Sequence, residues 1–102
     1  MHGGERILVV DDERLIRMTL RKLLEDEKYE VIEADNGKTA RELIEQDGID
    51  LVVLDYKLPD TTGIEILKQV RESHPETGVI LMTATHRWTT RSPRSGSAPT
   101  II

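Results

Sequence analysis

Short apolar runs alternate with amphipathic segments between residues 6 and 82 of this chain. The runs are RILVV (6–10), YEVIEA (29–34), LVVLD (51–55) and GVILM (78–82). Short runs of branched aliphatic residues are typical of strands that are buried on both faces. The helical segments between them are residues 14–25, 38–46 and 64–73. Strands that alternate with helices predict right-handed crossovers and a mainly parallel sheet, which is an α/β fold.

The first helical segment carries a stripe of aliphatic residues at helical spacing. These are Leu15, Ile16, Leu20, Leu23 and Leu24. Such a stripe predicts the face that packs on the sheet. We therefore expect Arg17, Arg21 and Lys22 to lie on the outer side of this helix.

Length and composition restrict the function classes. A chain of 102 residues holds at most one domain, and a net charge of −5 gives no general reason to bind nucleic acid. There is no cysteine, which excludes a disulfide framework. Residues 1–4 are interpreted as an N-terminal extension, and no segment approaches the length of a membrane span. We expect a cytoplasmic protein with no membrane partner.

Carboxylates stand where two of the predicted strands end. Asp11 and Asp12 follow the first strand, and Asp55 ends the third. The carboxyl ends of parallel strands share one rim of the sheet, where ligands usually bind. Gathered carboxylates repel one another, and a hard cation such as Mg²⁺ would relieve the repulsion. Each acid by itself is better explained as a helix cap or a solvated group, but their combination and order favour a metal site.

Three segments carry a family resemblance. ILVVDDE, LVVLDYKLPDTTGIEIL and VILMTA, in this order within residues 5–84, resemble the receiver domain of bacterial response regulators. The resemblance implies a flavodoxin-like, doubly wound parallel sheet with strand order 2-1-3-4-5. We expect this fold to be incomplete here, with the fourth helix and the fifth strand altered or absent. VILMTA also resembles receivers of enhancer-binding transcription activators, which implies contact with nucleic acid only through an output domain that this sequence lacks.

The resemblance also implies a reaction, in which a sensor histidine kinase donates a phosphoryl group to an aspartate in phosphorelay signal transduction. Asp55 would be the phosphoacceptor, and Thr83 would contact the phosphoryl group and act as a switch. Asp12 would bind Mg²⁺ directly, Asp11 mainly through water, and Lys57 through its backbone carbonyl. Such a domain is not an enzyme with turnover, since at most it catalyses its own phosphoryl transfer.

Two alternatives remain. Phosphatases with an aspartyl nucleophile carry a second Asp two positions later, where this chain has Lys57, so a hydrolase ranks low. The family also places a lysine after its fifth strand, but no lysine follows Lys68 here. The alternative function is therefore a receiver-like binding module that cannot switch.

The segment 85–102 departs from the receiver pattern. It is basic and rich in Ser and Pro, which is typical of a linker. A nucleic-acid-binding arm is a weaker interpretation, because Arg87, Arg91 and Arg94 are few and scattered. A third interpretation is a frameshift: with suitable codons, the receiver-like peptide VDDAVAAIRLGAYDY read one base later translates as residues 88–102. Trp88 followed by Thr89 fixes an Asp codon in the original frame. We therefore interpret this tail as frameshift-derived.

Loss of the fifth strand would leave a sheet edge open. GVILM would then present unpaired backbone groups to solvent. We expect either self-association through this edge, which we favour, or a folding back of the terminal PTII (99–102) as a cover.

Overall fold

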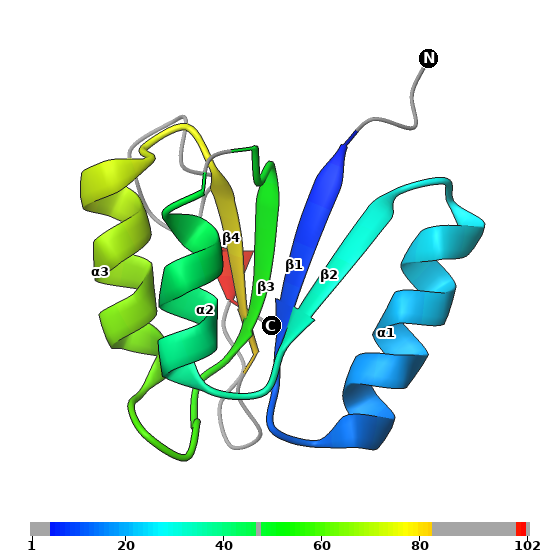
Figure 1. Cartoon of the computed structure of the whole chain (residues 1–102), viewed down its shortest axis with the longest axis horizontal. Coiled ribbons are helices and arrows are strands. Elements are labelled where there is room, and N and C mark those ends of the chain that lie inside the picture. The colour runs from blue at the N-terminus through cyan, green and yellow to red at the C-terminus, as the bar shows by residue number, and fades with distance from the viewer. Residues whose placement is uncertain (1–4, 47, 83–99, 102) are drawn as a thin grey trace.

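The computed structural model describes residues 5–46, 48–82 and 100–101, and its centre is a parallel sheet with strand order β2-β1-β3-β4-β5 (Figure 1). The strands are β1 (Arg6–Val10), β2 (Glu30–Ala34), β3 (Leu51–Asp55), β4 (Gly78–Met82) and β5 (Thr100–Ile101). The helices are α1 (Arg14–Asp26), α2 (Gly37–Ile44) and α3 (Gly63–Ser73). The order confirms the predicted flavodoxin-like fold.

Both faces of β1 are buried, as the apolar run predicted. Leu8 and Val10 belong to the core cluster that includes residues of α2 and α3, whereas Ile7 and Val9 belong to the cluster that Leu20 and Leu24 of α1 join. Figure 1 shows α1 on one side of the sheet and α2 with α3 on the other. Complete burial of one such aliphatic side chain stabilises the fold by roughly 1.5–3 kcal/mol.

The predicted contact face of α1 was partly wrong. Leu15 and Leu23 are 72% and 57% exposed, whereas Leu20 and Leu24 pack on the sheet. Arg17 and Arg21, which we expected on the outer side, reach the sheet and pair with Glu33 of β2. The sheet presents a carboxylate there, so long guanidinium side chains are more favourable on this face than further leucines.

The fifth strand is short. Thr100 and Ile101 pair in parallel with Ile80 and Leu81 of β4. Thr100 and Ile101 therefore lie in the sheet, as the folding-back alternative expected of this segment, and the altered fifth strand is confirmed. The predicted loss of the fourth helix concerns residues outside the described ranges. Among the described residues, no helix has both the length and the apolarity needed to cross a bilayer.

Candidate metal centre

The strand register brings the three predicted acids together. Val10 of β1 is paired with Leu54 of β3, so the next residues along the two strands, Asp11 and Asp55, emerge side by side at the carboxyl rim. One carboxylate oxygen from each of Asp11, Asp12 and Asp55 lies within 4.8 Å of the others. The expected convergence is therefore observed.

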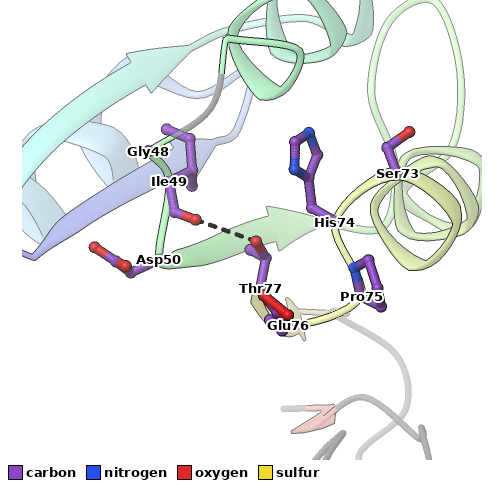
Figure 2. A pocket seen from close by; sticks show the side chains of 8 residues that line it. All are labelled: Gly48, Ile49, Asp50, Ser73, His74, Pro75, Glu76 and Thr77. Carbon is purple, nitrogen blue, oxygen red and sulfur yellow. Dashed lines mark hydrogen bonds between the residues drawn. The ribbon is translucent and has the colours of Figure 1, made fainter.

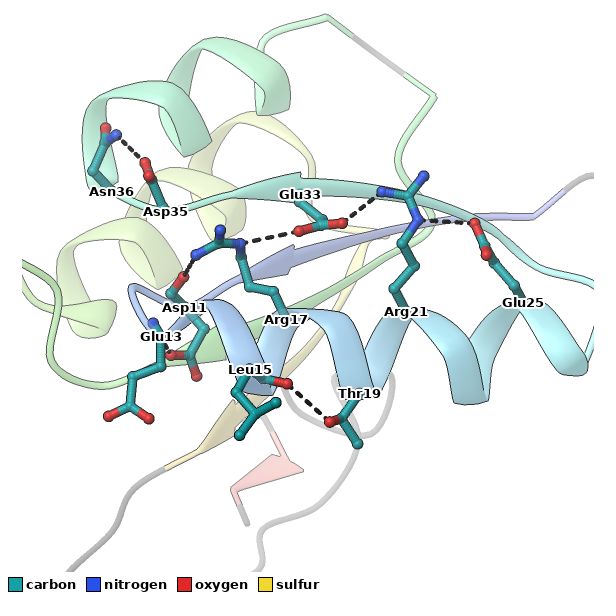
Figure 3. Close-up of polar contacts among 10 residues, drawn as sticks. All are labelled: Asp11, Glu13, Leu15, Arg17, Thr19, Arg21, Glu25, Glu33, Asp35 and Asn36. Carbon is teal, nitrogen blue, oxygen red and sulfur yellow. Dashed lines mark hydrogen bonds and ion pairs between the residues drawn. The ribbon is translucent and has the colours of Figure 1, made fainter.

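Asp11 is held at three points. Its amide N donates to Ala34 O at 3.1 Å. Its Oδ1 accepts from Glu13 N at 2.9 Å, and its carbonyl O accepts from Arg17 Nη1 at 2.9 Å (Figure 3). The residue is only 2% exposed. These contacts leave Oδ2 of Asp11 available for a ligand.

Burial and mutual repulsion make the cluster unfavourable when it is ionised. Burial is the main cause that raises the pKa of Asp11 above 3.8, with a further contribution from the charge of Asp12. Burial also raises the pKa of Asp55, and the charge of Asp11 adds to it, while the backbone amides of Lys57 and Tyr56 oppose the shift. Three carboxylate oxygens that repel one another fit a divalent cation such as Mg²⁺, which prefers hard oxygen ligands and would offset their negative charge.

A compact loop carries Lys57 beside the cluster. Tyr56 N donates to Met82 O at 2.9 Å, and Gly63 N donates back to Tyr56 O at 2.7 Å. Between them, Lys57 and Thr62 form an antiparallel bridge. This closed geometry fixes the backbone of Lys57 two residues after Asp55, so its carbonyl is a candidate further oxygen donor to the same cation.

Asp60 anchors this loop to α2, a role that the sequence did not suggest. Its Oδ1 accepts from Gly37 N at 2.7 Å, and its Oδ2 accepts from Lys38 N at 3.0 Å. These amides lower the pKa of the Asp60 carboxyl, with the Gly37 contact as the main cause. Asn36 caps the same helix by accepting from Thr39 N at 2.8 Å. Because α2 already has a local cap, no sequence signal pointed to a second one 23 positions away.

The predicted site residues thus fall into two groups. Asp11, Asp12 and Asp55 converge, and Lys57 lies in the adjoining loop. Thr83, the predicted switch residue, lies outside the described residues. Arg17 touches the cluster through the Asp11 carbonyl, although we expected it on the outer side of its helix.

A cleft of about 420 Å³ lies at the opposite end of the sheet (Figure 2). It is lined by residues 48–50, just before β3, and by residues 73–77 between α3 and β4. Thr77 Oγ1 donates to Ile49 O at 3.1 Å across it. Ligands of open parallel sheets bind at the carboxyl ends of the strands, so the acidic cluster is the better candidate site.

Comparisons with known proteins agree on one family. The model of the response regulator receiver domain matches residues 7–92. Sporulation initiation phosphotransferase F of Bacillus subtilis is 41% identical over 81 residues, 79% of this chain and 65% of its own length. The transcriptional regulatory protein SrrA of Staphylococcus aureus is 41% identical over 88 residues, 86% of this chain and 36% of its own length. The chain therefore spans less than two thirds of either relative.

Solved structures give the same assignment. The response regulator TrrA of Thermotoga maritima, in complex with Mg²⁺-BeF, is 40% identical with a TM-score of 0.75, covering 78% of this chain and 70% of that one. A chain from the complex of histidine kinase ThkA with TrrA is 33% identical with a TM-score of 0.80, covering 96% of this chain and 84% of that one.

Proposed function

This chain belongs to the response regulator receiver family, and we propose that it accepts a phosphoryl group from a histidine kinase onto Asp55 with the help of Mg²⁺. The observation that carries the proposal is the convergence of the carboxylates of Asp11, Asp12 and Asp55 within 4.8 Å. A phosphoacceptor needs a nucleophilic oxygen beside a source of positive charge, and this arrangement provides the oxygen and the ligands for the cation.

The three acids would bind the ion in different ways, because their side chains differ in exposure. Asp12 is exposed and can bind the ion directly, whereas the buried Asp11 has one oxygen engaged by Glu13 N and acts mainly through water. Asp55 and the backbone carbonyl of Lys57 would complete the protein ligands. When bound, Mg²⁺ would neutralise the negative charge that gathers on the phosphoryl oxygens during transfer.

The reaction would be a displacement at phosphorus. A carboxylate oxygen of Asp55 attacks the phosphorus atom of phosphohistidine and forms an O–P bond. The P–N bond breaks, and its electron pair remains on the imidazole nitrogen. The product is an aspartyl phosphate, so the chain acts as a phosphoacceptor and not as an enzyme with turnover. Thr83 would then hydrogen-bond the new phosphoryl group.

A lysine contact to the phosphoryl group would decide the fate of the phosphorylated state. A charge-assisted contact to the phosphoryl group stabilises the product and couples it to a switch. Residues 69–102 include no lysine that could make this contact, so for this 102-residue chain we expect slow labelling and weak coupling to Thr83. A receiver that binds partners without switching is the outcome if labelling does not occur.

Intact mass spectrometry tests the proposal. The full chain is incubated with a small phosphodonor and Mg²⁺, and we expect the addition of one phosphoryl group. Asp55→Asn should add none, and Asp12→Ala should require much more Mg²⁺. Asp50→Asn is the matched control, because this exposed aspartate stands just before β3, at the end of the strand opposite to Asp55. Labelling that persists in Asp55→Asn would exclude Asp55 as the acceptor.

The wider setting is also a proposal. A sensor histidine kinase would be the donor, since the structure of a 33% identical neighbour contains a histidine kinase with its response regulator. This chain would receive the phosphoryl group in the cytoplasm. A transcriptional output would lie in a segment beyond this chain, because the relative SrrA is a transcriptional regulatory protein of which this chain matches 36%.

A further inference from the structure

Arg17 connects the acidic cluster to the neighbouring strand. Its Nε donates to Glu33 Oε1 of β2 at 3.0 Å, and its Nη1 donates to the carbonyl O of Asp11 at 2.9 Å (Figure 3). Both hydrogen bonds come from one planar guanidinium group, whose N–H directions are fixed relative to each other. The position of the Asp11 carbonyl is therefore tied to that of Glu33.

Glu33 is itself held from a second side. Its Oε2 accepts from Arg21 Nη1 at 2.5 Å, and Arg21 Nε also pairs with Glu25 Oε2 at 2.9 Å. Its side chain is 23% exposed, so the two ion pairs are partly shielded from solvent. Glu33 is thus a fixed anchor on β2. Arg17 connects this anchor to the loop between β1 and α1, because it binds both Glu33 and the Asp11 carbonyl.

The hydrogen bond from Arg17 to the Asp11 carbonyl restrains the peptide group between two candidate metal ligands, Asp11 and Asp12. The Asp11 carbonyl lies in the planar unit that joins Asp11 to Asp12. Fixing this oxygen therefore limits how the peptide can rotate, and with it the direction in which Asp12 leaves the strand. The Asp11 amide and Oδ1 are held by Ala34 and Glu13, whereas the carbonyl of the Asp11–Asp12 unit is held by Arg17.

We propose that Arg17 is a positioning residue that fixes the Asp11–Asp12 peptide so that both carboxylates face one divalent cation. The inference rests on the proposed function, because it concerns the affinity of that cation site. Arg17 contacts the site through the main-chain carbonyl of Asp11 and not through a carboxylate.

The charge of Arg17 makes the sign of the effect informative. A guanidinium near the cluster repels a cation, so removal of the charge alone should tighten Mg²⁺ binding. Loss of positioning should weaken it. Arg17→Lys keeps the charge but cannot make both directed contacts, and Arg17→Met loses charge and contacts together. Positioning predicts weaker binding in both variants, whereas electrostatics alone predicts no change for Lys and tighter binding for Met.

The test is a Mg²⁺ titration of the full ¹⁵N-labelled chain, monitored through the amide chemical shifts of Asp12 and Tyr56. We expect Arg17→Lys to raise the Kd about tenfold, the lower end of the effect of residues that orient metal ligands. Arg21→Lys is the matched control, since it disturbs the same Glu33 but makes no contact with the cluster. Its Kd should stay within about twofold of wild type.

The outcomes separate the two proposals. If wild type and Asp12→Ala bind Mg²⁺ equally, the proposed metal site itself is overturned. If they differ but Arg17→Lys matches wild type, only the role of Arg17 is overturned. Equal weakening by Arg17→Lys and Arg21→Lys also overturns it, because the effect would then come from a general loss of stability and not from the contact between Arg17 and the Asp11 carbonyl. Should Arg17→Lys fail to fold, Glu33→Gln weakens the same anchor, and an unchanged Kd in that variant would equally reject the proposal.

Discussion

Gly63 lies directly against the main chain of Asp55. A Cβ atom on Gly63 would stand 2.6 Å from the Asp55 carbonyl oxygen and 2.8 Å from Leu81 Cδ1. Gly63 N also donates to Tyr56 O at 2.7 Å. The first residue of α3 thus supports the backbone of the proposed phosphoacceptor, and only glycine fits there.

We predict that Gly63→Ala destabilises the protein by about 1–3 kcal/mol, the usual cost of forcing extra volume into a packed site. Urea unfolding measures the change. Gly78→Ala is the control, because its Cβ would meet Leu51 Cδ1, a side-chain tip that can move, at 3.1 Å. Equal losses in the two variants would contradict the steric explanation.

Asp55→Asn should stabilise the metal-free protein at neutral pH by about 1 kcal/mol, a typical coupling energy between contacting groups. Folding raises the pKa of Asp55 through burial and the charge of Asp11. The contribution of Asp55 to the free energy of unfolding is therefore fully present below pH 3.8, where the carboxyl is protonated. It is lost as the pH rises through the higher pKa of the folded state. The advantage of the Asn variant should shrink as the pH falls toward 3.8, as measured by thermal melts in a chelator.

The control for Asp55→Asn is Glu42→Gln, which removes one negative charge from an exposed position on α2. This variant separates relief within the cluster from a general reduction of the negative net charge. A stabilisation as large as that of Asp55→Asn would show that the local repulsion is unimportant.

Millimolar Mg²⁺ should raise the melting temperature of the wild-type chain. A ligand that binds only the folded state stabilises it by about 2.7 kcal/mol when its concentration is 100 times the Kd. Asp12→Ala should lose most of this gain, because the exposed carboxylate is the proposed direct ligand. Differential scanning calorimetry in buffers free of other divalent ions provides the measurement, and identical shifts in both proteins would remove the metal assignment.

Glu33→Gln should cost about 1 kcal/mol of stability at neutral pH, since two partly shielded ion pairs become neutral contacts. Arg21 is the main cause that lowers the pKa of Glu33 below 4.5, with Arg17 adding to it. The stabilisation is therefore present above pH 4.5 and lost as the pH falls through the lowered pKa. Urea titrations across this window check it. Glu30→Gln, with a pair at 3.4 Å and a more exposed carboxylate, should cost less.

The outer edge of β4 should promote self-association. In the described part of the chain, β5 pairs with only Ile80 and Leu81 of this five-residue strand. Deletion of residues 100–102 should increase association at equal concentration, because more unpaired backbone is then exposed. Light scattering over a dilution series measures this, and two equally monomeric chains would refute the expectation.

The strand positions were predictable because a strand buried on both faces leaves a continuous apolar run. The runs at 6–10, 51–55 and 78–82 have the bounds of β1, β3 and β4. The position of the acids at the rim was predictable from parallel topology, since Asp11 and Asp55 come after paired residues of adjacent strands.

The contact face of α1 was less predictable. The spacing of apolar residues shows which side of a helix is apolar, but not which side chains the neighbouring strand presents to it. Glu33 of β2 attracts Arg17 and Arg21 to the sheet, which rotates Leu15 and Leu23 toward solvent. This pairing of elements is a tertiary property. A helical pattern alone contains no information about a carboxylate on a strand that comes later in the chain.

The Asp60 carboxylate has a consequence for hydrogen exchange. Amides in the first turn of a helix have no acceptor within the helix and normally exchange quickly with solvent. Here the protons of Gly37 and Lys38 are bound by Asp60, a residue of the loop after Asp55. Their protection factors would therefore report on whether that loop is docked or open, giving an observable at α2 for motion beside the phosphoacceptor.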